Sequence, residues 1–239
     1  MLNKKVICWD LDETLGSFKR IGYELARRDI PDFEEPTALR HGIKDLLEKL
    51  SSEGYSHFVT TSGTSDYAKE ALKRTGLIGY FQEVFGRDVV SAYDGGKKYR
   101  PVADNVGLSD EQAVSNMIVI GDAPGDKPVD LDGLVFVEHR GCHHTDSYVT
   151  AMILKKLNEL GDGDFKKGFE KMHQDAEIEE EKFRTFTFKR RRYDIGNGVK
   201  LKLEYRSNNI AENLGERVVP TITNIQADNY RREPLPVTQ

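Results

Sequence analysis

Two aspartates, Asp10 and Asp12, follow directly after a short apolar segment near the start of the chain, Val6–Trp9. Buried parallel strands have such near-continuous apolar sequences, and open α/β sheets bind ligands beyond the carboxyl ends of these strands. Two carboxylates that repel each other at a strand end favour a bound hard cation. Mg²⁺ accepts oxygen ligands and is commonly held by one or two carboxylates together with a substrate phosphate. Taken alone, the motif is equally compatible with an acidic turn in solvent.

The same pattern recurs far downstream, where the apolar segment Met117–Ile120 precedes Asp122 and Asp126. A third apolar segment, between the two acidic ones, ends in the hydroxyl residues Thr60 and Thr61. Three predicted strands thus end in polar side chains. Because parallel strands present their carboxyl ends at one edge of a sheet, these side chains are expected in one crevice.

A pair of lysines, Lys97 and Lys98, precedes a helix-like segment over 101–106. A lysine ammonium is a compact positive charge, and a threonine hydroxyl is a hydrogen-bond donor. These are the groups needed around the oxygens of a tetrahedral dianion. The residue types therefore indicate a phosphate site beside the carboxylates.

The ordered motifs resemble those of the haloacid dehalogenase superfamily of phosphotransferases, and the resemblance runs from about Lys4 to about Leu160. The residues that carry it are Asp10-Leu11-Asp12-Glu13-Thr14, Thr60, Lys98 and Gly121-Asp122-Ala123-Pro124-Gly125-Asp126. The first and last motifs, in this order, rarely occur together outside the family. The threonine and the lysine are common residues, and they support the resemblance only because they lie between those two motifs. The implied fold is an α/β, Rossmann-like doubly wound parallel sheet.

The resemblance also implies a role for each site residue. Asp10 would be the nucleophile that forms an aspartyl-phosphate, and Asp12 the general acid and base. Catalytic and phosphate-binding roles would fall to Thr60 and Lys98. The implied Mg²⁺ ligands are Asp10, the backbone carbonyl of Asp12, Asp122 and Asp126.

Two of these assignments have alternatives in the sequence. Thr61 or Ser62 could replace Thr60 in the phosphate site if the strand ends one residue later. Lys97 could replace Lys98, although Pro101 three residues after Lys98 resembles the family's K-P-x-P run. Tyr99 stands where the first proline of that run would be.

Residue 12 and the loop lengths bear on the reaction. Family members that act on phosphate esters carry an aspartate at this position, so a phosphoric monoester hydrolase is expected. The loops leave little room for a cap domain, which predicts an open, reduced-cap site. Such a site suits a bulky or macromolecular phosphate ester, such as a phosphoprotein or a nucleic-acid end. A small phosphate ester is also possible if another segment of the chain covers it. A catalytically silent binding module and a phosphotransferase with a non-water acceptor are the alternatives.

The composition is that of an ordinary globule, with 239 residues, 38% hydrophobic and 31% charged. A formal charge of -5 disfavours general nucleic-acid binding, and no apolar run has the length of a membrane span. The apolar stretch after Lys5 ends at Asp10, which disfavours a signal peptide. With two cysteines in the chain, a cytoplasmic protein without disulfides is expected.

Strand and helix patterns alternate through residues 1–160, which are predicted to form the phosphatase core. The expected elements are helices over 17–28, 42–52, 66–75 and 147–160, and strands over 81–85 and 134–137. Residues 161–239 are predicted to be a charged and β-rich extension. It contains a helix over 165–182 and a hairpin over 184–205 that turns at 195–198.

The predicted hairpin is basic on one face and rim, and an anionic partner there is one hypothesis. The alternative, which we favour, is a solvated edge whose charges discourage strand pairing. The residues concerned are Lys189, Arg190, Arg191, Arg192, Lys200 and Lys202. A second cluster, made of His139, Cys142, His143 and His144, lacks the paired-cysteine spacing of a structural zinc site, so a polar loop is expected there.

Overall fold

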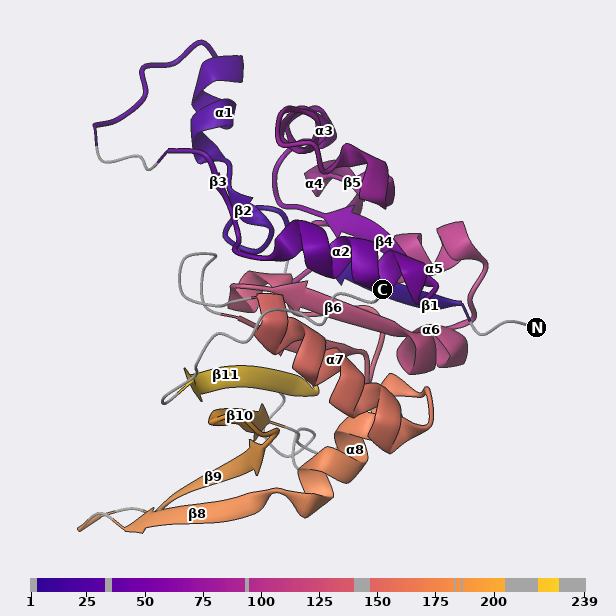
Figure 1. Ribbon diagram of the computed structural model, residues 1–239, viewed down its shortest axis with the longest axis vertical. Helices are drawn as coiled ribbons and strands as arrows, with labels where there is room; N and C mark the ends of the chain where they lie inside the picture. The colour runs from indigo at the N-terminus through magenta and orange to yellow at the C-terminus, as the bar shows by residue number, and fades with distance from the viewer. Residues whose placement is uncertain are drawn as a thin grey trace.

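The computed structural model describes residues 4–32, 36–92, 95–139, 147–182, 184–185, 187–204 and 219–227. Within these ranges, one mixed sheet of nine strands runs through the molecule in the order β5-β4-β1-β6-β7-β11-β10-β9-β8 (Figure 1). The strands of the first half are β1 (Lys5–Trp9), β4 (Tyr55–Thr60), β5 (Phe81–Phe85), β6 (Met117–Gly121) and β7 (Val135–Glu138).

These five strands are all parallel, and β1 lies between β4 and β6. Trp9 pairs with Val59 on one side and with Ile120 on the other, so the three strands end at the same level. The backbone N–H of Asp10 continues the pairing by donating to Ile120 O at 2.8 Å. The predicted doubly wound α/β fold is confirmed, and its register brings the carboxyl ends of the strands together.

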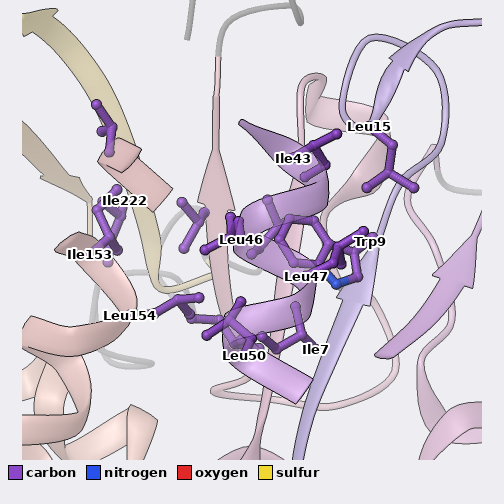
Figure 2. Close-up of a cluster of buried hydrophobic side chains, with 14 of the residues drawn as sticks. Ile7, Trp9, Leu15, Ile43, Leu46, Leu47, Leu50, Ile153, Leu154 and Ile222 are labelled. Atoms are coloured by element: carbon purple, nitrogen blue, oxygen red, sulfur yellow. The ribbon is translucent and has the colours of Figure 1, made fainter. Parts of the chain in front are cut away.

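The alternation of β1 divides its side chains between two buried clusters. Ile7 and Trp9 pack on the face covered by α2 (Ile43–Ser52), α3 (Ser65–Arg74) and α7 (Ser147–Gly161). Figure 2 shows Ile43, Leu46, Leu47 and Leu50 of α2 beside Ile7 and Trp9, with Ile153 and Leu154 of α7 completing the contact.

Val6 and Cys8 point to the opposite face, toward α5 (Arg100–Val106) and α6 (Asp110–Asn116). Burial of each large aliphatic side chain contributes about 1.5–3 kcal/mol. A strand with both faces covered is therefore held firmly, and so is the loop that begins at Asp10. The remaining short helices of this region are α4 (Arg87–Val90) and two 3₁₀ turns, η1 (Ile78–Tyr80) and η2 (Pro124–Asp126).

Between β1 and α2 the chain forms a small projection. It consists of a two-stranded ribbon, β2 (Gly16–Ser17) with β3 (Ala38–Leu39), and the helix α1 (Lys19–Leu25). Figure 1 shows α1 standing away from the sheet and beside α3. The helix predicted over 17–28 exists but is shorter at both ends, whereas α2, α3 and α7 match their predicted ranges to within one residue.

The helix predicted over 165–182 is wrong in its second half. Helix α8 (Phe165–Asp175) ends at Asp175, and β8 (Glu177–Lys182) follows it as the edge strand of the sheet. Strand β8 pairs with β9 (Thr187–Asp194), so that glutamates of β8 stand opposite arginines and lysines of β9. This cross-strand pairing of opposite charges exists only in the sheet, and it overrides the helical propensity of the glutamates.

The predicted hairpin is confirmed as β9 and β10 (Val199–Glu204), joined by residues 195–198. Val199, Leu201 and Leu203 are buried in the same cluster as Trp9, so the apolar face of the hairpin packs on the main body. Strand β11 (Thr221–Ala227) joins the hairpin to the core by pairing antiparallel with β10 and parallel with β7. The described part of the C-terminal extension therefore continues the central sheet, while the division into two domains stays a prediction.

Candidate active site

The centre of the candidate site is a buried cluster of unlike charges at the ends of β1 and β6. The ammonium Nζ of Lys97 lies 2.6 Å from Asp10 Oδ1 and 2.7 Å from Asp126 Oδ1. It also donates a hydrogen bond of 2.8 Å to Thr60 O, at the end of β4. All three side chains are buried. The lysine thus connects three segments that are far apart in the sequence.

Asp126 is held in place by backbone groups of its own loop. Its Oδ2 accepts hydrogen bonds from the N–H groups of Asp122, at 3.2 Å, and Ala123, at 3.1 Å. This arrangement depends on Gly121, because a Cβ atom at that position would lie only 2.4 Å from Asp126 Oδ2. The glycine in the Gly121-Asp122 motif is therefore required by the close approach of a carboxylate.

The cluster fits a divalent cation. Asp10, Asp122 and Asp126 each offer a carboxylate oxygen, and the three oxygens lie within 4.8 Å of one another. Three carboxylates face a single ammonium group here, so two negative formal charges remain when all three are ionised, and a divalent cation would balance them. Oxygen donors of this kind suit Mg²⁺. A metal site is therefore supported by the donor set, although the identity of the ion stays a prediction.

The acid–base properties of the cluster reflect burial and crowding. Burial raises the pKa of Asp10 to about 7, the charge of Lys97 opposes the rise, and Asp126 adds to it. Burial and the charge of Asp126 raise the pKa of Asp122 to about 6. Burial acts to lower the pKa of Lys97, but the carboxylates of Asp10 and Asp126 outweigh it and raise that pKa. The lysine is therefore a permanent cation, and the two raised aspartates bind a metal in competition with protons.

Asp12 lies outside this cluster, at the mouth of a groove of about 810 Å³ that runs between α1 and α3. Its Oδ1 accepts a hydrogen bond of 2.6 Å from the hydroxyl of Tyr67, and burial raises the pKa of its carboxyl group. Asp12 is absent from the three carboxylates that could share a cation. Its predicted part in metal binding thus depends on the backbone carbonyl alone.

Thr60 and Thr61 differ in what their hydroxyl groups do. Thr60 Oγ1 donates to Trp9 O at 3.4 Å, and its side chain is fully buried. Thr61 Oγ1 accepts a hydrogen bond of 3.0 Å from the N–H of Gly63, so its own proton is available to another acceptor. Thr60 is the last residue of β4 and Thr61 follows it, and the choice between their hydroxyl groups for the phosphate site stays a prediction.

The sequence favours Lys98 as the lysine of the site, but the structure places the alternative, Lys97, at the carboxylate cluster. Lys98 is exposed, whereas Lys97 and Tyr99 are buried. The segment is extended, with Lys97 N donating to Lys127 O and Lys98 N donating to Val90 O, so successive side chains point to opposite sides. The Tyr99 hydroxyl donates to Asp126 O at 2.7 Å, which keeps Tyr99 and Lys97 on the inner side and Lys98 on the outer side. Sequence spacing alone cannot set the phase of a short extended segment.

Two further residues at the site were missed. Tyr67 contacts Asp12, as described above, and Arg40 donates through Nη2 to Glu13 O at 3.0 Å and through Nε to Thr14 O. Glu13 has a φ of 60°, which a non-glycine residue adopts only when its surroundings hold it there. Arg40 thus fastens the loop that carries Asp12. Neither residue has a local sequence signal, because each acts through a contact distant in sequence.

Other polar residues near the fourth motif lie outside the cluster. Asp130 accepts hydrogen bonds from Tyr99 N and Arg100 N, so it caps the start of α5. His139 is buried with Nε2 3.0 Å from Thr150 Oγ1. Cys142, His143 and His144 lie outside the described residues, so the structure does not bear on a metal site there.

The basic face of the hairpin is matched by acidic and backbone acceptors. Arg192 Nε lies 3.0 Å from Glu179 Oε2, and Arg191 donates to His173 O at 2.9 Å. This arrangement resembles a charge-paired sheet edge more than a free cationic surface. Among the described residues, no helix has the length and apolar character needed to cross a bilayer.

The parallel strand order and the acidic cluster at its carboxyl edge define an open α/β protein, and part of its chain is similar to a known family. The model of the family described as haloacid dehalogenase-like hydrolase matches residues 26–127. The match includes Thr60 and Lys97 and extends to the loop of Asp122 and Asp126. The matched region begins after Asp10 and Asp12. The evidence that these two residues belong to the site is therefore the pairing of β1 with β4 and β6, and not the family match.

Individual proteins resemble parts of the chain. A phosphoglycolate phosphatase of Vibrio parahaemolyticus is 32% identical over 85 residues, which are 35% of this chain and 36% of that protein. The chain spans 36 to 62% of the length of the curated relatives it matches.

Two solved structures extend the comparison. A haloacid dehalogenase-like hydrolase from Streptococcus pneumoniae has a TM-score of 0.43 and 19% identity, over 61% of this chain and 89% of that one. A hydrolase of the same superfamily from Ehrlichia chaffeensis has a TM-score of 0.45 and 13% identity, over 64% and 98%.

Proposed function

We propose that this protein is a Mg²⁺-dependent phosphoric monoester hydrolase that works through an aspartyl-phosphate on Asp10. The observation that carries the proposal is the buried cluster in which Asp10 shares a lysine with Asp126 and lies within cation-sharing distance of Asp122. A carboxylate that merely stabilised the fold would not need two further acids beside it, since like charges raise the free energy of the folded state.

The chemistry divides into two displacements. An oxygen of Asp10 forms a bond to phosphorus while the bond from phosphorus to the ester oxygen breaks, and Asp12 gives a proton to that leaving oxygen. Water then attacks phosphorus and gives a proton to Asp12, and the bond between phosphorus and Asp10 breaks. On substrate binding, Lys97 exchanges one of its hydrogen bonds within the protein for one to a phosphoryl oxygen, and the hydroxyl of Thr61 donates to another, in both steps.

The metal would be held by Asp10 and Asp122, with Asp126 close to it, and the backbone carbonyl of Asp12 completing the protein's ligands. When bound, Mg²⁺ offsets the negative charge that otherwise keeps an anionic nucleophile away from an anionic ester. The ion pair between Lys97 and Asp126 keeps the side chains of this site in one arrangement.

The substrate is proposed to extend from the site along the groove between α1 and α3. The described residues between β1 and α2 contribute one short helix and a two-stranded ribbon, so no large cap closes over the groove within that part of the chain. A bulky or macromolecular phosphate ester fits such an open site. An anionic partner for the basic hairpin remains a weaker hypothesis, because β8 already places glutamates against β9.

A substrate panel tests the proposal. Purified protein is incubated with a nucleoside monophosphate, a sugar phosphate, phosphoglycolate, a phosphopeptide and a 5′-phosphorylated oligonucleotide, with Mg²⁺ or with EDTA. Phosphoglycolate is included because of the name of one relative. We expect Mg²⁺-dependent phosphate release from at least one substrate and its loss in Asp10→Asn.

Two results would point to the alternatives. Normal Mg²⁺ binding with no phosphate release from any substrate would favour a binding module. Transfer of phosphate to added glycerol in preference to water, measured as glycerol phosphate formed, would favour a phosphotransferase.

A further inference from the structure

Tyr67 is the residue that connects Asp12 to the small projection between β1 and α2. It lies in the first turn of α3, whose N-terminus is capped by the hydroxyl of Thr64 accepting from Tyr67 N. Its own hydroxyl donates to Asp12 Oδ1 at 2.6 Å, across 55 residues of sequence. The contact is therefore made by tertiary structure, and its length is that of a well-formed O–H···O hydrogen bond.

The ring of Tyr67 is enclosed by two glycines. A Cβ atom on Gly63 would lie 2.8 Å from the ring carbon Cδ1, and a Cβ atom on Gly22 would lie 3.3 Å from Cε2. Gly63 belongs to the loop after β4, and Gly22 belongs to α1. The ring thus fills the space between the phosphate-binding loop and α1, where side chains larger than glycine would displace it.

An oxygen of a carboxyl group that accepts a hydrogen bond is the less favourable position for the proton of that group. Because Oδ1 of Asp12 accepts the phenol proton, the transferable proton of Asp12 is carried on Oδ2. The general-acid role of Asp12 belongs to the proposed function, and it requires this proton to face the leaving oxygen. The carboxyl group of Asp12 must therefore be oriented with Oδ2 toward the substrate. Because the ring of Tyr67 is packed between two glycines, its hydroxyl holds Oδ1 in one position and so fixes this orientation.

We propose that Tyr67 is a positioning residue that directs the Oδ2 proton of Asp12 toward the oxygen of the leaving group. This inference rests on the proposed function, since it assumes that Asp12 acts as the general acid. Tyr67 itself touches neither the phosphorus nor its oxygens. Its contribution is the orientation of Asp12, and α1 takes part by closing one side of the ring.

The dependence on the leaving group tests this role. An alkyl phosphate needs a proton on its leaving oxygen, whereas a nitrophenyl phosphate has a leaving group stable enough to depart without one. We expect Tyr67→Phe to lower kcat/KM for the alkyl ester about 10- to 100-fold, which is less than the roughly 10²- to 10⁴-fold that a general acid itself contributes. The same variant should change kcat/KM for nitrophenyl phosphate less than about threefold. Because kcat/KM covers only the steps through departure of the leaving group, later hydrolysis does not obscure the comparison.

Two further variants complete the experiment. Asp12→Asn should show the same selectivity for the leaving group with a larger amplitude. Tyr80→Phe removes a tyrosine hydroxyl from η1, on a part of the chain outside the site, and should leave both rates unchanged. Circular dichroism and thermal unfolding of Tyr67→Phe are compared with the wild type, because the phenylalanine ring should keep the packing against both glycines.

The outcomes separate the two claims. An equal loss on both esters, or no loss on the alkyl ester, overturns the positioning role of Tyr67 and leaves the proposed function intact. Absence of turnover on either ester by the wild type, with Mg²⁺ bound, overturns the proposed function and the role of Tyr67 with it.

Discussion

Replacement of Lys97 by methionine is the sharpest test of the site, because Lys98 provides a neighbouring control. Lys97 is 1% exposed and gives its three protons to Asp10, Asp126 and Thr60 O. Methionine has similar length and no charge, so Lys97→Met removes the cation with little change in volume. Lys98→Met makes the same chemical change on an exposed side chain one residue away.

The size of the effect follows from what the ammonium contacts. Loss of a charged donor to the oxygens of a transition state costs about 2.7–4 kcal/mol, which is about 10²- to 10³-fold in kcat. Lys97 also opposes the rise in the pKa of Asp10, so the variant's Asp10 should hold its proton to a pH above 7. Part of the lost activity should therefore return on the alkaline side, where the nucleophile becomes ionised.

Lys97→Met should also lower the free energy of unfolding. Removal of one partner from a buried ion pair typically costs about 3–5 kcal/mol, and protonation of Asp10 would offset part of that cost. The assay measures kcat for nitrophenyl phosphate between pH 6 and 9, and urea unfolding reports the free energy of unfolding. Loss of activity in Lys98→Met with activity retained in Lys97→Met would refute the assignment of the buried lysine.

Further predictions concern the metal, the glycine at the end of β6 and the contact between α7 and α8. The raised pKa values of Asp10 and Asp122 are about 7 and about 6, so protons should displace Mg²⁺ as the pH falls through this range. The increase in Tm caused by Mg²⁺ should therefore be present at pH 8 and absent below about pH 5. A Tm increase that is unchanged at pH 5 would contradict these pKa directions. Gly121→Ala should weaken Mg²⁺ binding about tenfold or more by calorimetry, since its methyl group would lie 2.4 Å from Asp126 Oδ2. Wild-type affinity in this variant would show that Asp126 is not held as described. Gly168→Ala should lower the free energy of unfolding by about 1–3 kcal/mol, because its Cβ would lie 2.1 Å from Leu157 O in α7, whereas Gly79→Ala, with open space around it, serves as the control.

The sequence alone determined the sheet and the acids at its edge. Short apolar segments, each followed by Asp, Thr or Gly, predict parallel strands with polar ends, and the structure places Asp10, Thr60 and Gly121 in register. Val199, Leu201 and Leu203 alternate with charged residues, a pattern that indicates one apolar face of the hairpin, and in the structure this face packs on the core. These patterns are readable because the information is local: hydrophobic period and turn residues act within a few positions of the chain.

Tertiary structure decided the features that depend on contacts between distant segments. Lys97 rather than Lys98 faces Asp10, because the buried Tyr99 and the backbone pairing with Val90 and Lys127 set the phase of an extended strand. Residues Glu177–Lys182 form β8, because β9 presents arginines and lysines opposite their glutamates. A one-residue shift in an extended segment reverses every side chain, and the energy that selects one phase comes from partners that the local sequence does not contain.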